Sequence, residues 1–131
     1  MFNINVKIKP STIHGNGLFA DEPVKAGSTV YQGNAELDLI ISEETFSALT
    51  TREQQFISQY GAHSSLDDQW HLPHDHIRFC NHSNNPNLKL SYPDKNSHSC
   101  HIVAVRDIAA GEELLQDYRE FEELRECLQD L

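Results

Sequence analysis

The segment "RFCNHSNNPN", residues 78–87, constrains the fold more than any other part of the sequence. Its four asparagines, histidine and proline make it too polar for a core strand and too rich in asparagine for a stable helix. Its lead-in is nonetheless apolar, with Ile77, Phe79 and Cys80. Buried amide and imidazole groups must be hydrogen-bonded. Two interpretations are therefore open: a capped surface turn, or a polar segment held in the interior beside a ligand.

The length of the chain sets the number of domains to expect. Its 131 residues suit one domain, and 38% hydrophobic with 23% charged residues suit a globular chain. We therefore predict a single domain over residues 1–131. No apolar run approaches the roughly 20 residues that cross a bilayer. The N-terminus "MFNINVKIKP" alternates in polarity and forms no apolar signal, so we expect a cytoplasmic protein without membrane contact.

The formal net charge of −10 limits the partners that the chain can bind. An acidic protein repels phosphate groups, so we expect no direct binding of nucleic acid. The same charge attracts basic partners, such as lysine-rich peptide tails. A second interpretation is that the acidic surface only keeps the protein soluble.

Residue types that bind metals are present, but not in a pattern typical of a metal site. The chain has three cysteines: Cys80, Cys100 and Cys127. Their number is odd and no CxxC pair exists, so we expect buried, reduced thiols rather than disulfides or a zinc site. The stretch "WHLPHDHIRF" holds three histidines: His71, His74 and His76. Their spacing fits neither a helical pair nor a zinc finger, so we expect a solvated loop and no bound metal.

Alternating polarity predicts short strands along most of the chain. The stretch "FNINVKIK" places four apolar residues on one face: Phe2, Ile4, Val6 and Ile8. The stretch "LFADEPVKAGSTVYQG" predicts short strands broken by proline and glycine. Further strands are predicted in "ELDLIIS", near Trp70, in "LKLSY", in "CHIVAVRDI" and just before Tyr118. The chain therefore reads as a mostly β domain.

Two helices are predicted in the middle of the chain and one at its end. Ser42 can cap a short helix in "EETFSAL". Thr50 and Glu53 have the spacing of a capping box before a helix over residues 51–60, which would end at Gly61. The tail predicts an amphipathic helix, whose apolar face would hold Phe121, Leu124, Leu128 and Leu131.

Two more stretches carry groups that could bind a ligand or act on one. In "HGNG", Gly15 and Gly17 would let the backbone approach a ligand closely, although a lone GxG is also an ordinary turn. In "VRDIAAGEELLQDY", a turn leads to Tyr118 at the end of a short strand. A tyrosine there can also fill the core with its hydroxyl at the rim. Neither stretch decides a function by itself.

Taken together and in order, "GNGLFA", "RFCNHSNNPN" and "VRDIAAGEELLQDY" resemble the SET-domain protein lysine methyltransferases. That family shows a GxG followed by Leu-Phe-Ala, then RFxNHSxxPN, then RDIxxGEEL closing on Asp-Tyr. The resemblance gives a motif core of about residues 13–118 and leaves a C-terminal helix of about 119–131. It implies a β-clip type fold of small curled sheets, with a short helical insert and a C-terminal pseudoknot. The asparagine-rich segment would then lie buried beneath the threaded C-terminal strand.

The resemblance also implies S-adenosylmethionine as cofactor and methyl transfer to a lysine side chain of a protein. The implied cofactor-binding residues are Gly15, Asn16, Gly17, Arg78, Asn81, His82, Tyr118 and Phe121. Phe121 could equally be a core residue. Tyr118 matches the catalytic tyrosine, and Tyr31 in "VYQG" matches an aromatic position that lines the lysine channel. Such a channel lowers the pKa of the lysine by desolvation and aligns its amine, so neither a strong general base nor a metal is needed.

The chain departs from the family pattern at three places. Asn84 stands where many members carry a zinc-binding cysteine, and no cysteine cluster follows Tyr118, so no zinc is implied. The usual wall of the substrate channel is then missing, and either the C-terminal helix or a homodimer would have to complete it. Leu90 stands where some members carry a second channel tyrosine, which could change how many methyl groups are added.

Two other functions remain open at the level of sequence. The first is a catalytically inactive SET-like scaffold that binds a peptide or protein partner. The second is another β-clip protein that binds a sugar or a metal, supported only by "GLFADEPVKAGSTV". The intact glycines, the "NHS" triplet and Tyr118 favour the enzyme, whose substrate would be a lysine-containing and basic protein segment.

Overall fold

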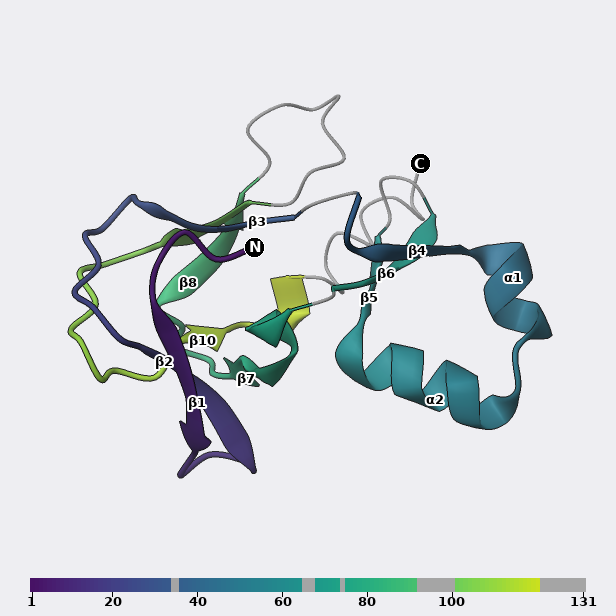
Figure 1. The fold of residues 1–131 in the computed structure, drawn as a ribbon, viewed down its shortest axis with the longest axis horizontal. Coiled ribbons are helices and arrows are strands. Elements are labelled where there is room, and N and C mark those ends of the chain that lie inside the picture. Colours follow the sequence, from purple (N-terminus) through teal and green to yellow (C-terminus); the bar gives the residue numbers. More distant parts are fainter. Residues whose placement is uncertain (34–35, 65–67, 74, 92–100, 121–131) are drawn as a thin grey trace. The chain divides into compact units, whose positions relative to one another are not determined.

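The computed structural model describes residues 1–33, 36–64, 68–73, 75–91 and 101–120. Contacts within the chain separate two compact units (Figure 1). The first unit consists of residues 1–33 and 75–118, and the second of residues 34–74 with the chain after residue 118. No helix among the described residues is long and apolar enough to cross a membrane. The two units are described separately below.

The first unit is built from small sheets of short strands. Strands β1 (Val6–Pro10) and β2 (Asn16–Ala20) form an antiparallel hairpin, in which Val6 lies opposite Ala20. A second sheet has β9 (His101–Ala104) between β3 (Thr29–Gln32) and β8 (Leu88–Ser91), all antiparallel. The predicted strands in these stretches are thus confirmed, and each is four or five residues long.

The core of the first unit is made of side chains from β2, β3, β8 and β9 and from the turns between strands, whereas β1 has no fully buried side chain. Its most deeply buried apolar side chains are Leu18, Val30, Leu88, Ile108 and Leu114. Alternate residues of β8 and β9 are buried, as expected for strands with one face on a core. Apolar burial of this kind is the main stabilising contribution to such a fold.

A parallel strand pair places the end of the first unit beside the asparagine-rich segment. Strand β10 (Leu115–Gln116) pairs with β7 (Asn81–His82), and Ser83 N–H donates to the Gln116 carbonyl at 2.9 Å. On its other side, the chain just before β10 is hydrogen-bonded to β2, because Leu114 N–H donates to the Leu18 carbonyl at 2.7 Å. Figure 1 shows β7 and β10 side by side. Residues 111–118 are therefore held between β2 and β7, as a C-terminal pseudoknot requires.

The second unit combines a three-stranded sheet with two helices. Strand β6 (Gln69–Leu72) lies between β4 (Leu39–Ser42) and β5 (Ala62–Ser64), with all neighbours antiparallel. Helix α1 (Glu43–Ala48) is capped by the Ser42 hydroxyl, which accepts from Thr45 N–H at 3.1 Å. Helix α2 (Thr51–Tyr60) starts with the predicted capping box. Both helices and their capping residues are confirmed.

Gly61 ends α2 as predicted, but for a different reason. Its φ is −108°, so the residue is not in the left-handed conformation that usually favours glycine at a helix end. A Cβ there would instead lie 2.8 Å from the carbonyl oxygens of both Ile57 and His71. Glycine is thus required by close backbone packing between the helix end and β6.

Other predictions need adjustment. The N-terminal strand begins at Val6 rather than Phe2, because Asn3 donates both its N–H and its side-chain amide to carbonyls around Val30. Of the loop histidines, His71 lies in β6 and His76 lies in a short 3-10 helix, η1 (His76–Phe79), so the solvated loop is wrong for these two. His74, Cys100, Cys127 and the helix predicted for the tail lie largely outside the described residues.

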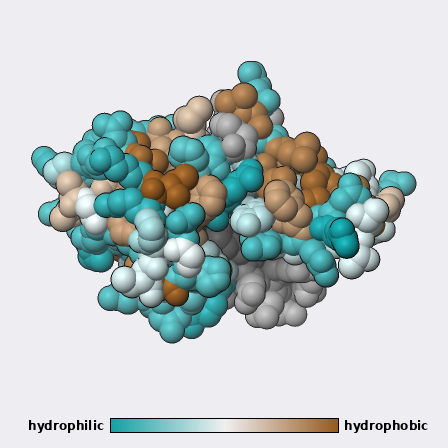
Figure 2. All heavy atoms as spheres, turned by 60° about the horizontal axis from the view of Figure 1, so that its bottom comes forward, coloured by the Kyte–Doolittle hydropathy of each residue, from teal (hydrophilic) through white to brown (hydrophobic). Residues whose placement is uncertain are grey.

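Large apolar side chains remain exposed in both units. They include Ile13 and Val105 in the first unit, and Leu39 and Phe56 in the second. Figure 2 shows such side chains as patches among polar ones. Exposed apolar groups in small numbers are normal for folded proteins, so these patches by themselves assign no function.

Candidate functional site

Tyr118 is fixed to the asparagine-rich segment at two points. Its backbone N–H donates to Nδ1 of His82 at 3.0 Å, and its hydroxyl donates to the Cys80 carbonyl oxygen. The rings of Tyr118 and His82 lie with centroids 5.2 Å apart. Tyr118 remains 44% exposed, so one side of it is open to solvent or to a ligand. The hydroxyl itself is part-buried, and its hydrogen bond gives it a fixed direction.

The chemistry of this hydroxyl follows from its surroundings. Burial raises the pKa of Tyr118 above its ordinary value, and the neighbouring Cys80 adds to the rise. Burial also raises the pKa of the Cys80 thiol strongly, with a further contribution from the Glu113 charge. The Cys80 thiol is buried and 3.2 Å from the Leu114 carbonyl oxygen. Both groups are therefore neutral at physiological pH, and the Tyr118 hydroxyl is available for hydrogen bonding rather than as an ionised base.

His82 takes a defined tautomer in this arrangement. Because its Nδ1 accepts from the Tyr118 backbone, the proton of the neutral ring is on Nε2, which lies 3.1 Å from Oδ1 of Asn84. The Asp117 carboxylate is 3.8 Å from Nδ1. The imidazole thus serves as a fixed support for the backbone at Tyr118.

A second cluster joins Asn81 to the glycine loop through a carboxylate. Asn81 Nδ2 donates to Oε2 of Glu113 at 3.0 Å and to the His14 carbonyl at 3.1 Å. Oε1 of Glu113 also accepts from the Ser11 hydroxyl at 2.8 Å. Both amide protons of Asn81 are therefore used within the protein. This cluster ties residues 11–14 to β7 and to the segment before β10.

The two glycines of the loop have different structural roles. Gly15 has a φ of +45°, a left-handed conformation that side chains disfavour. No atom outside its chain neighbours would lie within 4 Å of a Cβ at this position. At Gly17 a Cβ would lie 2.5 Å from Oε2 of Glu113. Gly17 therefore lets the Glu113 carboxylate reach Asn81. Gly15 and Asn16 are exposed residues, and the Gly15 carbonyl accepts from Ser11 N–H at 2.8 Å.

Asn87 shows why the segment is so rich in asparagine. It is completely buried, and its Nδ2 donates to the Glu113 carbonyl at 2.8 Å and to Oε2 of Glu112 at 3.0 Å. Its Oδ1 accepts from Leu115 N–H at 2.8 Å. One side chain therefore holds three groups of the turn that leads into β10. The segment thus combines both interpretations: Asn81 and Asn87 are buried polar supports, whereas Asn84 and Asn85 are exposed in a turn where the Ser83 hydroxyl accepts from Asn85 N–H at 3.0 Å.

The remaining predicted site residues lie at several places. Arg78 is half-buried in η1, whose start is capped by Asp75. Tyr31 is only 4% exposed, and its ring packs edge-on against Phe2 with centroids 5.0 Å apart. Leu90 is also buried and lies opposite Ile102 in the sheet. Phe121 lies outside the described residues. The roles given to these four positions stay predictions.

Sequence reasoning missed the residues that connect the motifs. Glu113, Ser11 and Asn87 were not singled out, although they carry most of the polar contacts between the loop, β7 and β10. The paired glutamates of "GEEL" were the available signal. Two adjacent carboxylates at a turn need hydrogen-bond donors, and buried asparagine side chains can supply them. Glu112 and Glu113 indeed contact Asn87 and Asn81 respectively.

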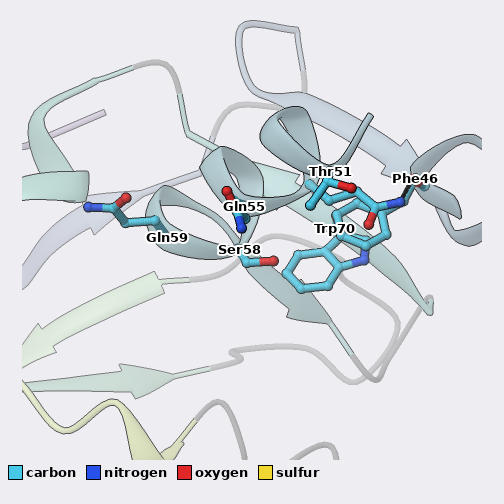
Figure 3. A pocket seen from close by; sticks show the side chains of 7 residues that line it. Phe46, Thr51, Gln55, Ser58, Gln59 and Trp70 are labelled. Carbon is cyan, nitrogen blue, oxygen red and sulfur yellow. Dashed lines mark hydrogen bonds between the residues drawn. The ribbon is translucent and has the colours of Figure 1, made fainter. Parts of the chain in front are cut away.

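A groove in the second unit contains none of the predicted site residues. It is an open depression of about 520 Å³, lined by Phe46 of α1, one face of α2 and Trp70 (Figure 3). The Trp70 indole stacks on Phe46 with centroids 4.5 Å apart. The lining of α2 is polar, with glutamines, a serine and a threonine. We therefore place the candidate site in the first unit, around Tyr118.

Comparisons with known sequences bear on the family of the chain. The model of the SET domain matches residues 15–119. The chain is 32% identical over 122 residues to a provisionally named histone-lysine N-methyltransferase 1 of Plasmodium falciparum, isolate 3D7. It is 31% identical over 118 residues to histone-lysine N-methyltransferase trithorax of Drosophila virilis. These matches cover 89% and 83% of this chain, but only 2% and 3% of the length of these relatives.

Comparisons with solved structures bear on the fold. One match is the structure of a humanized mutant of Polycomb Repressive Complex 2 from Chaetomium thermophilum, bound to the inhibitor GSK126. Its TM-score is 0.68 and its sequence identity is 22%, and the match covers 90% of this chain and 15% of that chain. The crystal structure of a provisionally named histone methyltransferase of Plasmodium falciparum matches with a TM-score of 0.63 and 20% identity, covering 88% of this chain and 94% of that one. The predicted fold of small sheets with few helices is confirmed.

Proposed function

The chain belongs to the SET-domain family, and from that premise we propose that it transfers a methyl group from S-adenosylmethionine to a lysine side chain of a protein. The observation that carries the proposal is the double attachment of Tyr118, by its N–H to His82 and by its hydroxyl to the Cys80 carbonyl. This attachment fixes a neutral hydroxyl at a half-open position, where a substrate amine could meet it.

The direction in which the Tyr118 hydroxyl donates its proton determines which hydrogen bonds its oxygen can accept. Since the proton is donated to Cys80, the phenolic oxygen keeps its lone pairs for another partner. It can accept a hydrogen bond from a neutral substrate amine and so direct the nitrogen lone pair. Oxygen atoms at this point also stabilise partial positive charge on a nearby carbon. When bound, S-adenosylmethionine would supply an electrophilic methyl group on a sulfonium.

The loop around Gly15 in the first unit leaves space in which such a cofactor could bind. Gly15 and Asn16 are exposed residues, and no atom outside its chain neighbours would lie within 4 Å of a Cβ at Gly15. Asn81 is linked to this loop through the His14 carbonyl. We propose that Gly15, Asn16, Gly17, Arg78, Asn81, His82, Tyr118 and Phe121 bind the cofactor. Asn81 would act mainly by positioning the loop, because its amide protons are already used.

The proposed substrate is a lysine in a basic protein segment. The net charge of −10 favours such a segment electrostatically. The printed names of two relatives refer to histone lysines, which supports lysine as the acceptor. We propose that Tyr31 lines the lysine channel from β3, and that a homodimer or the C-terminal helix completes the channel. A cytoplasmic location remains part of the proposal.

The first test is binding of the cofactor, which needs no knowledge of the substrate. Calorimetric titration of the purified chain with S-adenosylmethionine, and in parallel with its demethylated product, should show one saturable site at micromolar concentration. A folded sample that binds neither would contradict the proposed cofactor site and favour a scaffold that binds a partner without catalysis.

The second test concerns Tyr118. Tyr118→Phe should keep cofactor affinity within a few-fold, and should lower transfer to a lysine peptide about a hundredfold, the usual effect of removing one positioned polar group. Transfer is measured by mass spectrometry on a library of basic peptides. Tyr60→Phe, in α2, is the matched control and should transfer at the wild-type rate. Equal rates for Tyr118→Phe and wild type would overturn the assignment.

A further inference from the structure

Three side chains of metal-binding type meet in the second unit, apart from the site around Tyr118. Glu43 is the first residue of α1, His63 lies in β5, and Asp68 lies just before β6. Nε2 of His63 is 2.5 Å from Oε1 of Glu43 and 3.3 Å from Oδ1 of Asp68. One ligand atom from each of the three lies within 4.8 Å of the others.

The histidine of this cluster is held rigidly. Its side chain is only 6% exposed, and its ring lies edge-on to Trp70 with centroids 5.3 Å apart. Trp70 is itself stacked on Phe46. Neither ring nitrogen of His63 has a hydrogen-bond partner of ordinary geometry among the described residues. Nε2 of a buried imidazole thus lies close to two carboxylates without an ordinary hydrogen bond to either of them.

We propose that Glu43, His63 and Asp68 bind a divalent transition-metal cation, with Zn²⁺ as the cation to be probed. One imidazole with two carboxylates is a donor set that such ions accept, whereas Ca²⁺ and Mg²⁺ prefer oxygen alone. A tetrahedral site with bonds near 2.1 Å has ligand atoms about 3.4 Å apart. The distance from His63 to Asp68 already matches this value.

Glu43 needs only a small adjustment to complete the set. Its oxygen is 2.5 Å from His63 Nε2, which is closer than two ligands of one ion lie. The Glu43 side chain is 44% exposed and that of Asp68 is 81% exposed, so both carboxylates have room to move while the histidine stays in place. A bound ion would join the start of α1, the strand β5 and the approach to β6. The inference does not depend on the proposed methyl transfer.

The chain offers its own reporter for this site, because Trp70 is its one tryptophan. Untagged protein is titrated with Zn²⁺ by calorimetry, and with Co²⁺ while Trp70 fluorescence is followed. We expect one saturable Zn²⁺ site, quenching of Trp70 by Co²⁺ with the same stoichiometry, and reversal of both by a chelator. No heat and no quenching up to millimolar metal would mean that the cluster is an ion pair only.

Substitutions separate this site from adventitious binding by the other histidines. Glu43→Gln and Asp68→Asn should each weaken Zn²⁺ binding by about tenfold or more, as loss of a ligand does. Glu44→Gln, the neighbouring exposed acid of the same helix, and His71→Gln in β6 are the matched controls and should bind within twofold of wild type.

The opposite pattern would overturn the proposal. Unchanged affinity in both carboxylate variants, or loss of binding in His71→Gln alone, would show adventitious binding at another place. Because Glu43 and Asp68 are at least partly exposed, these variants should fold, and circular dichroism checks this before titration. His63→Gln is left as a supporting variant, since replacing a buried side chain can destabilise the unit by itself.

Discussion

At the scale of single residues, Glu113 carries the contacts on which the proposed cofactor loop depends. Its carboxylate accepts from Ser11 and Asn81, and Gly17 is a glycine so that it can do so. In Glu113→Gln the side-chain NH2 group faces one of these two donors and cannot accept from it, so at least one charge-assisted hydrogen bond is lost. Such a bond is worth about 1.5–3 kcal/mol. We expect about a tenfold loss of S-adenosylmethionine affinity, measured by calorimetry.

The control for Glu113 is another carboxylate of the first unit. Glu22 accepts a hydrogen bond at 2.9 Å from the N–H of Asn5, which is not one of the proposed site residues. Glu22→Gln should lower the melting temperature somewhat without changing cofactor affinity. If Glu113→Gln behaved in the same way, its carboxylate would only stabilise the fold and would not position the loop.

At the scale of elements, helix α2 depends on its capping box. The Thr50 hydroxyl accepts from Glu53 N–H at 3.2 Å, and the Glu53 carboxylate accepts from Thr50 N–H at 2.9 Å. The bond from the Thr50 backbone is the main reason why the pKa of Glu53 is lowered. Thr50→Ala should cost about 1 kcal/mol in the free energy of unfolding, measured with urea. Thr51→Ala, inside the helix, should cost clearly less, and equal losses would refute the cap.

The turn before β10 gives a prediction for pH. Burial alone would raise the pKa of Glu112, but hydrogen bonds from Asn87, Arg106 and Ala109, and the charge of Arg106, lower it below its usual 4.5. Because the pKa is lower in the folded state, the stabilisation is present above pH 4.5 and is lost as the pH falls through the folded value. Glu112→Gln should therefore destabilise the protein at pH 7 in urea unfolding, and by a smaller amount at pH 3. A constant difference would contradict this contribution.

At the scale of the whole molecule, the sequence predicted local features better than distant ones. Ser42 and the Thr50–Glu53 pair were identifiable because a cap and its partner are three residues apart. The motif residues Asn81, His82 and Tyr118 were found by their resemblance to a family, and the structure brings His82 and Tyr118 together. Glu113 could not be paired with Ser11 in advance, because nothing in the sequence selects one acid among 20 for a partner 102 residues away. The cluster around His63 was missed because no known ligand spacing links Glu43, His63 and Asp68 in the sequence.

The long separation between Ser11 and Glu113 has a consequence for how the chain folds. At about 5–20 residues per second, a ribosome needs about 5–20 s to add the 102 residues from Ser11 to Glu113. The glycine loop is therefore synthesised that long before the Glu113 carboxylate that it contacts. Hairpins and helices form in microseconds, and the contacts of Glu113 close long loops against an entropy cost. We therefore expect the polar centre to form late in folding, outside the folding nucleus. Substitutions there should speed unfolding more than they slow folding, which makes the lifetime of the native state sensitive to this centre.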